Sequence, residues 1–310
     1  PEGITFTTQE QIDNFQVNYP GCTEIEGNVI ISDDWSGDIT NLNGLNALTA
    51  IWSHLLITEN SGLINLSGLE NLINVGGSLE ISYNFSFVSM EGLDNLSNIG
   101  GTLWIHNNQI LASISSLSNL TSIGGSLYIG LADLLTNLSG LENLTSIGEN
   151  LGINENDSLT DISTLTNITS IPGDLFIQNN DVLTGLTGLD NLTSIGGSLG
   201  IVLNPILISI SAFASLEYIG GSFLCADNYN LTSLTGLENI VSISDDLTIA
   251  NCQILTDLSG INNIDSIGGY LVISNNESLI SLNALDGLIS VGEGVSIVGN
   301  NAIINLSGLE

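Results

Sequence analysis

The stretch Asn119–Ile129 reads NLTSIGGSLYI, and it returns with few changes as NLTSIGGSLGI at Asn191–Ile201 and as IDSIGGYLVI at Ile264–Ile273. When these copies are aligned, the apolar residue that follows the glycine pair recurs every 24 residues, without insertion or deletion. Its positions are Leu55, Leu79, Leu103, Leu127, Leu151, Leu175, Leu199, Phe223, Leu247, Leu271 and Val295. Such a strict period predicts a solenoid, in which each repeat forms one coil.

The apolar pattern inside one repeat predicts the shape of the coil. With the residue of the preceding list taken as offset 0, offsets 0 and 2 are apolar, which indicates a strand with one buried face. Offsets 8, 11, 14, 17 and 20 are also apolar, and this three-residue spacing favours a chain that turns inward every third residue, with short 3₁₀ pieces at most. An imperfect first copy begins at Val29, 26 residues before Leu55, and we expect its extra length in ISDDWSGDIT, residues 31–40.

Asparagine occupies offset 5 in nine of the eleven repeats, with Ala132 and Cys252 as the exceptions. We expect these amides to turn inward and to hydrogen-bond to one another and to the backbone, because a bend would otherwise bury unpaired polar groups. This predicted structural ladder consists of Asn60, Asn84, Asn108, Asn156, Asn180, Asn204, Asn228, Asn276 and Asn300.

A second asparagine row stands at offset 16, from Asn71 to Asn263, and we expect it to face inward or to lie at a bend. Glycosylation sequons such as Asn119-Leu-Thr and Asn143-Leu-Thr use this row. The repeat consensus itself creates them, so they do not predict a sugar.

The motif L-x-I-x-x-N, as in LFIQNN at Leu175–Asn180, resembles the leucine-rich repeat, and the longer unit is closer to the receptor L domain and its bacterial surface-protein relatives. This resemblance implies a β-solenoid of the right-handed, parallel β-helix-like kind, with about eleven full 24-residue coils. It also implies an N-terminal cap at residues 1–28 and a single solenoid domain at residues 29–310, whose C-terminal end has no cap. In such proteins a cysteine placed like Cys22 tends to pair with one just before the segment, and no such partner is present in this chain.

The charge composition excludes whole classes of function. The chain of 310 residues has no Lys or Arg, 33 Asp plus Glu and two His, for a net charge of −33. Without fixed positive charge it lacks the groups that neutralise nucleic-acid phosphates or clamp nucleotides, so we expect no nucleic-acid partner. No apolar run is long enough for a transmembrane segment. We therefore expect a secreted or cell-surface protein of bacterial type whose signal peptide has been removed.

No set of residues predicts catalysis or a cofactor. The glycine pair could wrap a phosphate, but it lacks the lysine and the helix of a phosphate-binding loop, so we interpret it as the corner of the coil. His54 and His106 should point outward, without a nucleophile and carboxylate beside them. We expect a noncatalytic protein with no catalytic, cofactor-binding or metal-binding residues.

The acidic pairs Asp33–Asp34 and Asp245–Asp246 match no calcium-loop motif and are expected to be solvated surface, although weak, nonspecific Ca²⁺ binding would fit the net charge. Cys225 replaces the inward residue at offset 2, and Cys252 replaces a ladder asparagine. Because these two offsets should not lie above one another in adjacent coils, we expect buried thiols and treat a disulfide as the less favoured alternative.

The outward positions of the predicted sheet suggest a partner surface. Trp104 and Tyr128 share offset 1 in adjacent repeats and should stack, and Phe176 stands between two glycines at the same offset. A contiguous apolar row on a sheet is typical of an interface. The binding-face candidates are Trp104, Tyr128, Phe176, His106, Leu224 and Val272.

Two classes of function remain. The first is a noncatalytic adhesion or binding module, whose sheet face holds a protein or a glycan at a surface. The alternative is a structural subunit that self-associates into an extracellular filament or surface layer.

Overall fold

The computed structural model describes residues 1–309 and divides into two compact units. Unit 1 comprises Pro1–Glu149 and Glu155–Asp157, and unit 2 comprises Asn150–Asn154 and the chain from Ser158 onward. Each unit is a parallel β-solenoid of 24-residue coils, which confirms the predicted fold class. The predicted single domain at residues 29–310 stays a prediction, and its last residue lies outside the described part of the chain.

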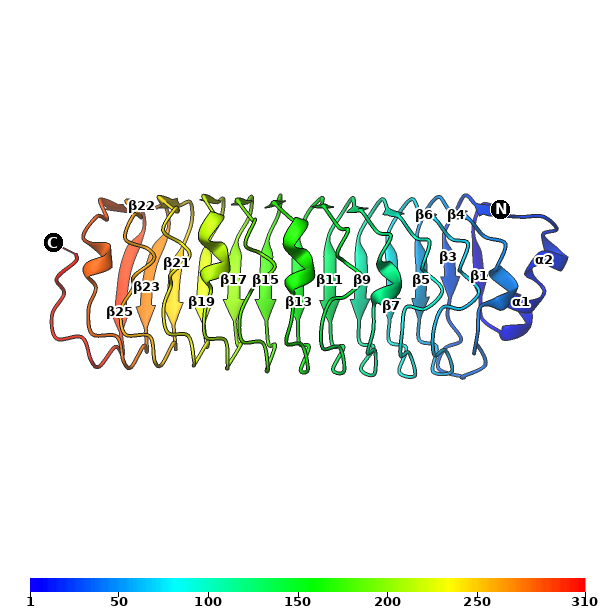
Figure 1. Ribbon diagram of the computed structural model, residues 1–310, viewed down its shortest axis with the longest axis horizontal. Helices are drawn as coiled ribbons and strands as arrows, with labels where there is room; N and C mark the ends of the chain where they lie inside the picture. The colour runs from blue at the N-terminus through cyan, green and yellow to red at the C-terminus, as the bar shows by residue number, and fades with distance from the viewer. Residues whose placement is uncertain (310) are drawn as a thin grey trace. The chain divides into compact units, whose positions relative to one another are not determined.

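In unit 1, one long strand per coil lies beside its counterpart in the next coil, and the short strands form a second parallel sheet (Figure 1). The long strands are β1 (Ile4–Phe6), β3 (Val29–Ile31), β5 (Leu55–Thr58), β7 (Leu79–Ser82), β9 (Leu103–His106) and β11 (Leu127–Gly130). The short strands are β2 (Glu24–Ile25), β4 (Ala50–Ile51), β6 (Asn74–Val75), β8 (Asn98–Ile99), β10 (Ser122–Ile123) and β12 (Ser146–Ile147). The helices are α1 (Gln9–Asp13), α2 (Phe15–Asn18) and the 3₁₀ helices η1 (Asn43–Leu45) and η2 (Ser115–Leu117).

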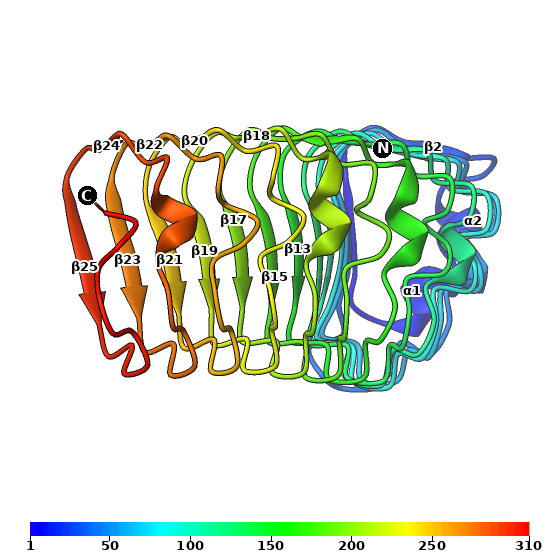
Figure 2. The same ribbon diagram turned by 60° about the vertical axis from the view of Figure 1, so that its left-hand side comes forward.

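Unit 2 repeats this arrangement, with its short strands in two separate groups. The long strands are β13 (Leu151–Asn154), β15 (Leu175–Gln178), β17 (Leu199–Val202), β19 (Phe223–Ala226), β21 (Leu247–Ala250), β23 (Tyr270–Ser274) and β25 (Gly294–Val298). The short strands are β14 (Ser170–Ile171), β16 (Ser194–Ile195), β18 (Tyr218–Ile219), β20 (Ser242–Ile243), β22 (Ser266–Ile267) and β24 (Ser290–Val291). The 3₁₀ helices are η3 (Ser163–Asn167), η4 (Ser211–Ser215) and η5 (Asn283–Leu285), which lie on the wall of the coil away from the long strands (Figure 2).

The strand register follows the sequence period. Leu127 pairs with Leu103 and Leu79 pairs with Leu55, each 24 residues apart. Val29 pairs with Leu55, so the 26-residue first coil keeps the same register. The inward apolar residue that stands eight positions after the anchor in the other coils is here Ile39, ten positions after Val29. The two extra residues therefore lie between Ile31 and Ile39, as the sequence predicts.

Each coil fills the core with the residues that the period marks as inward. In the coil that begins at Leu127 the buried residues are Leu127, Ile129, Leu135, Leu138, Leu141, Leu144 and Ile147, which are at most 3% exposed. Burying each such side chain contributes about 1.5–3 kcal/mol to folding. The same rows repeat from coil to coil, so the core is continuous within each unit.

The predicted asparagine ladder is present in each unit. Asn84 donates from Nδ2 to the carbonyls of Ile57 and Ser82 at 2.8 and 3.0 Å, and its Oδ1 accepts from the backbone N–H of Asn60 at 3.0 Å. The ladder asparagines are fully buried except Asn300, which is 9% exposed. Each amide thus satisfies backbone groups at the bend that follows a long strand.

The glycine pair forms a corner where successive coils stack closely. A Cβ on Gly124 would collide with the carbonyl oxygen of Gly100, and one on Gly148 would collide with that of Gly124. The first glycine of the pair therefore allows close backbone contact between these coils, while Trp52, Pro172 and Ser244 occupy the same offset in other coils. The interpretation as a structural corner agrees with this geometry.

The second asparagine row differs from one expectation. Asn71 and Asn95 are exposed, not inward, and their Nδ2 groups donate to the carbonyls of Asn46 and Glu70 in the preceding coil. This row lies at a bend on the outer wall, because the core at offsets 14 and 17 is filled by leucines on either side of it.

Residues 1–28, expected to form a cap, contain a strand that the sequence pattern missed. Ile4 of β1 pairs with Val29 of β3 and extends the long sheet by one strand. Helix α1 begins with a capping box between Thr8 and Gln11, and the Gln9 side chain bonds to backbone groups of residues 40 and 41. The segment satisfies backbone groups at this end of unit 1.

Candidate functional site

Six aromatic side chains of unit 1 form a continuous row on its surface, which we call the aromatic ribbon. Four of them are exposed, and His106 and Tyr128 are half-buried. Its members, in order, are Phe85, Trp35, Tyr83, His106, Trp104 and Tyr128. Neighbouring ring centroids lie 4.8, 6.3, 6.3, 5.7 and 4.7 Å apart along this order. Rings at such distances interact with one another. The ribbon is the longest chain of aromatic contacts among residues 1–309.

Trp35 reaches the ribbon because of the two-residue insertion in the first coil. Asp34 and Trp35 have φ angles of 51° and 66°, in the left-handed region that bulky residues rarely adopt. The backbone N–H of Trp35 donates to the carbonyl of Glu59 at 2.9 Å, and its carbonyl accepts from the Ser61 hydroxyl at 3.1 Å. The next coil thus holds the looped segment in place, and the Trp35 ring stacks on Phe85 at an interplanar angle of 21°.

Tyr83 and Phe85 lie in the bend after β7. Tyr83 stands at offset 4, where every regular coil turns through positive φ, and its own φ is 56°. Asn, Asp, Gly and Glu fill most of these positions, because short polar residues and glycine tolerate this conformation best. A tyrosine there costs stability, and it is 41% exposed between Trp35 and His106.

Trp104, His106 and Tyr128 stand on the outer face of the long sheet. Trp104 and His106 occupy alternate positions of β9, and Tyr128 of β11 pairs directly with Trp104. The two rings lie 4.7 Å apart with an interplanar angle of 57°, so they are in contact across adjacent coils but are tilted and not stacked as predicted. The histidine was expected to be an ordinary outward residue as well as a binding-face candidate, and it links the two halves of the ribbon.

Carboxylates and hydroxyls flank the ribbon. Glu80 pairs across the sheet with Trp104, and its Oε1 accepts from the Ser82 hydroxyl at 2.7 Å. Glu59, whose backbone carbonyl accepts a hydrogen bond from the N–H of Trp35, lies in the bend that follows β5. With no Lys or Arg in the chain, no cationic side chain other than a protonated histidine can stand beside these groups. The site combines apolar faces with hydrogen-bond acceptors and negative charge.

The other predicted binding-face residues belong to unit 2 and have a different character. The ring of Phe176 lies against Gly200, where an added Cβ would collide with it, so the aromatic ring fills the hollow left by the glycine. Leu224 and Val272 are half-buried in β19 and β23 on either side of Thr248. The structure therefore does not join these three residues into a cluster of exposed rings like the ribbon.

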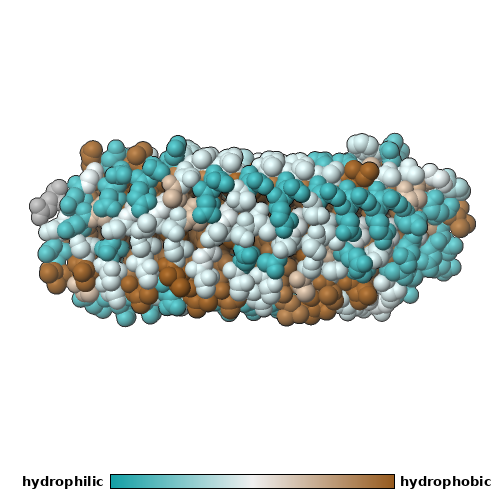
Figure 3. All heavy atoms as spheres, in the orientation of Figure 1, coloured by the Kyte–Doolittle hydropathy of each residue, from teal (hydrophilic) through white to brown (hydrophobic). Residues whose placement is uncertain are grey.

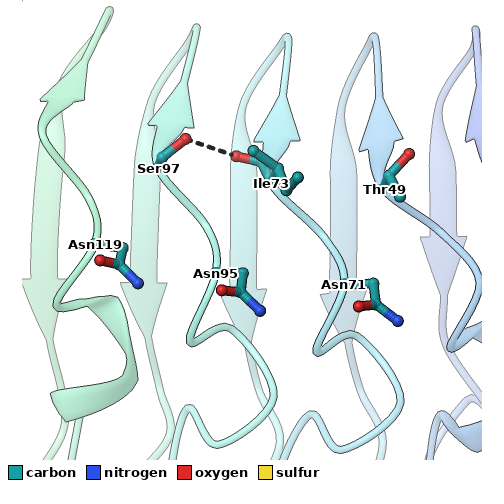
Figure 4. Close-up of a pocket in the computed structure, with 6 residues that line it drawn as sticks. All are labelled: Thr49, Asn71, Ile73, Asn95, Ser97 and Asn119. Atoms are coloured by element: carbon teal, nitrogen blue, oxygen red, sulfur yellow. Dashed lines mark hydrogen bonds between the residues drawn. The ribbon is translucent and has the colours of Figure 1, made fainter.

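A shallow hollow on the outer wall of unit 1 is the second candidate site. Its volume is about 480 Å³, and Figure 4 shows its residues in two parallel rows. They are Thr49, Asn71, Ile73, Asn95, Ser97 and Asn119. The three amides donate to carbonyls of the preceding coil, and the Ser97 hydroxyl donates to the Ile73 carbonyl at 3.2 Å. These polar groups already hold adjacent coils together, so the hollow is a weaker candidate than the ribbon.

The wall that carries the 3₁₀ helices is mostly hydrophilic or neutral (Figure 3). Hydrophobic residues gather near the edge at which the long strands end. Exposed apolar side chains such as Ile110 and Leu134 lie in the bends of unit 1 that follow these strands. Single exposed apolar residues in turns carry little functional information.

The acidic pairs do not behave as expected from the sequence. Asp33 is only 5% exposed: its backbone N–H donates to Oδ1 of the ladder residue Asn60, and its Oδ2 accepts from the N–H of Ile39 at 2.8 Å. Asp246 accepts from the N–H of Tyr270 at 2.7 Å and so helps to link two coils. The expectation of solvated surface was wrong for Asp33, because the inserted loop turns this carboxylate inward. Within residues 1–309, no group of three or more His, Cys, Asp or Glu is arranged to hold a metal ion.

The two inward cysteines are closer than their offsets suggested. The sulfurs of Cys225 and Cys252 lie 3.9 Å apart, and both side chains are fully buried. Offset 5 of one coil reaches back under offset 2 of the preceding coil, as the bond from Asn276 to the Ile249 carbonyl shows. The argument that these positions do not lie near one another was therefore wrong, whereas the thiols are free as expected.

Comparisons with known proteins agree with this geometry. Residues 21–112 match the family model of the receptor L domain, a stretch that contains all of the ribbon except Tyr128. Together with the solenoid fold, this match fits a repeat protein of the leucine-rich-repeat and receptor-L kind. A comparison with curated proteins gives no match to this chain. None of the helices in residues 1–309 has the length and hydrophobicity to cross a membrane.

Sequence reasoning identified half of the ribbon. It found Trp104, Tyr128 and His106, which stand at regular strand positions, and it missed Trp35, Tyr83 and Phe85, which stand in bends. The sequence signal for Trp35 was the insertion in ISDDWSGDIT. An insertion in one coil of an otherwise strict repeat adds residues that the fold does not require, and Trp35 is in this stretch.

Proposed function

We propose that unit 1 is a noncatalytic binding module that holds an extended glycan, neutral or positively charged, along the aromatic ribbon. The observation that carries this proposal is the continuous row of six rings on an exposed face. The row includes a tryptophan in a strained backbone conformation. Strain of this kind persists where the surrounding structure enforces it, and it concentrates at binding sites.

The chemistry of the ribbon suits a sugar chain. The face of an aromatic ring is negatively charged, so it attracts the C–H groups on the apolar face of a sugar. The hydroxyls of the same sugar need hydrogen-bond partners, which the side chains of Glu80, His106 and Tyr128 can supply. The rings follow one another across several coils, which favours a polymer over a single small molecule.

The net charge restricts the kind of glycan. Carboxylate, sulfate and phosphate groups are usually bound by Arg or Lys, and the chain has neither. A polyanion would also be repelled by a protein with a charge of −33. Uncharged hexose polymers and amino-sugar polymers with free ammonium groups are the classes that fit. Ammonium groups would gain further from contact with the ring faces.

The proposed setting is outside the cell, at the surface of a bacterium or in its secreted material. The resemblance of the repeats to bacterial surface proteins supports it, as does the absence of Lys and Arg, because proteases that cut after these residues find no site in the chain. Adhesion through a surface glycan is the activity that this setting and the ribbon together favour.

The experiment is a binding assay on insoluble polysaccharides of three classes: neutral hexose, amino-sugar and uronate polymers. A Trp104→Ala and Tyr128→Ala double variant, and separately a Trp35→Ala variant, should each weaken binding about fivefold or more, since loss of a contacting ring costs roughly 1 kcal/mol or more. Tyr218→Ala is the matched control, because Tyr218 is a 52% exposed aromatic residue of unit 2.

Equal binding by the wild-type protein and the ribbon variants would reject the proposal. Preferential binding to the uronate polymer would also reject it. Tight binding to a basic peptide that depends on the same rings, with no binding to any glycan, would assign the ribbon to a protein partner instead.

The alternative of self-assembly rests on a separate observation. An apolar strip on the long sheet of unit 2 contains Val202, Leu224, Ala250, Val272 and Val298, of which Val298 is 61% exposed. Electron microscopy of the protein with and without a chelator tests this alternative. Fibres or sheets would support it, and monodisperse particles at high concentration would argue against it.

A further inference from the structure

In unit 2, two cysteines occupy the two positions that one repeated hydrogen bond between adjacent coils joins. In the nine coils with an asparagine at offset 5, this residue donates its amide to the carbonyl at offset 2 of the preceding coil, as Asn276 does to Ile249 at 3.0 Å. Cys225 occupies offset 2 of one coil, and Cys252 occupies offset 5 of the next. The repeat consensus at these positions is isoleucine and asparagine.

The replacement weakens the asparagine ladder where it occurs. The Cys252 sulfur lies 4.0 Å from the Cys225 carbonyl, where an asparagine would make a short N–H···O bond. The Asn228 amide donates to the Cys225 sulfur at 3.5 Å. A thiol is a weak donor and a weak acceptor, so this pair of substitutions gives up hydrogen bonding that the other coils keep. The sulfurs nevertheless lie 3.9 Å apart, at the distance of direct contact.

The folded environment shifts the pKa values of the two thiols in opposite directions. The hydrogen bond to Cys252 and the burial of Cys225 raise the pKa of Cys225 well above its ordinary value. The same hydrogen bond lowers the pKa of Cys252. Cys252 is thus the more acidic of the two thiols in the closed coil.

We infer that Cys225 and Cys252 form a disulfide that staples two adjacent coils of unit 2. The bond forms by exchange with a disulfide oxidant, such as oxidised glutathione or a protein disulfide. The thiolate of one cysteine attacks one oxidant sulfur and expels the other as a thiol. The second cysteine, after losing its proton, attacks the protein sulfur of this mixed disulfide and expels the second thiol. The chain loses two protons and two electrons, and the oxidant takes them up.

Burial determines when this exchange takes place. Both side chains are fully buried, so an oxidant cannot reach them in the folded coil. The bond therefore forms while these coils are still open, and it is protected from reductants once they have closed. The closed bond requires the sulfurs to approach from 3.9 Å to about 2.05 Å.

The experiment refolds the full chain in a glutathione buffer that is either oxidising or fully reducing, then alkylates it under denaturing conditions and measures its intact mass. The Cys22→Ser background leaves only the two buried thiols. After oxidising refolding, the expected product carries no alkyl group and lacks two hydrogen atoms, whereas the reduced product carries two alkyl groups. The oxidised form should unfold roughly 5 °C or more above the reduced form, because the bond closes a loop of 27 residues.

The Cys225→Ile and Cys252→Asn double variant is the matched control, because it restores the repeat consensus and should fold in either buffer. Its unfolding temperature should be the same in both. Two alkyl groups after oxidising refolding would overturn the inference. So would equal unfolding temperatures of the oxidised and reduced forms, or a disulfide-linked dimer in place of the internal bond.

Discussion

At the scale of the residue, Tyr83 shows how the proposed site conflicts with the repeat. Its φ of 56° belongs to a position that asparagine or glycine fills best, and a bulky residue there costs about 1–2 kcal/mol. Tyr83 nevertheless contacts both Trp35 and His106 in the ribbon. A residue that a fold alone would not select, in the middle of an exposed aromatic row, indicates a role in binding.

The substitution Tyr83→Asn separates stability from binding. It should stabilise unit 1 by about 0.5–1 kcal/mol, because asparagine tolerates positive φ, and weaken glycan binding about tenfold. Urea unfolding and the polysaccharide assay measure the two effects. Leu203→Asn is the control, since Leu203 of unit 2 has the same φ of 56° and lies outside the ribbon. It should give the stability gain alone. A loss of stability in Tyr83→Asn would contradict the strain assigned to this position, and unchanged binding would show that the ribbon does not depend on this residue.

At the scale of the structural element, we expect the buried asparagine ladder to contribute more to the free energy of unfolding than the exposed asparagine row at offset 16. Asn84→Ala would leave the Asn60 N–H without its partner in the core and would remove the bond to the Ile57 carbonyl, so the expected loss is about 3 kcal/mol. Asn71→Ala removes one bond at the surface, where water can replace it, and should cost less than about 1 kcal/mol. Urea midpoints of the two variants, read from tryptophan fluorescence, make the comparison. Equal losses would show that burial of the amide is unimportant.

Elements that repeat were predictable, and contacts between irregular positions were not. The period fixes offsets 0, 2, 5 and 8 in every coil, so the strand register and the ladder follow from the sequence alone. The rings of Trp35 and Phe85 are in contact although their two coils are separated by a third, and both residues lie in bends. A periodic sequence pattern does not predict such a contact. The contact between Cys225 and Cys252 was missed for a related reason. Strand register pairs Cys225 with Ile249, whereas the bend after the strand brings Cys252 beneath it.

At the scale of the whole molecule, charge is the property that sets this chain apart. All of its many carboxylates lack a Lys or Arg partner, and net charge of one sign destabilises a compact state through self-repulsion. Burial and the charge of Asp157 raise the pKa of Asp133 above its ordinary value. The contribution of this group to stability therefore increases as the pH falls from above its raised pKa toward the ordinary pKa of a free aspartate side chain. Hydrogen bonds from Ser259 lower the pKa of Asp257, whose contribution is present at neutral pH and is lost in acid.

Acidification and salt should therefore stabilise the protein. We expect the unfolding temperature to be higher at pH 5 than at pH 7, because fewer carboxylates repel one another. It should fall again in stronger acid, as groups such as Asp257 become protonated.

Added NaCl should raise the unfolding temperature at pH 7, with little effect near the isoelectric point of about 4.1, since salt screens only the repulsion that is present. CaCl₂ at equal ionic strength should be more effective if divalent cations bind the surface weakly. Calorimetric scans across this grid of pH and salt measure these effects, and an unfolding temperature at pH 7 that does not respond to salt would contradict the view that self-repulsion limits stability.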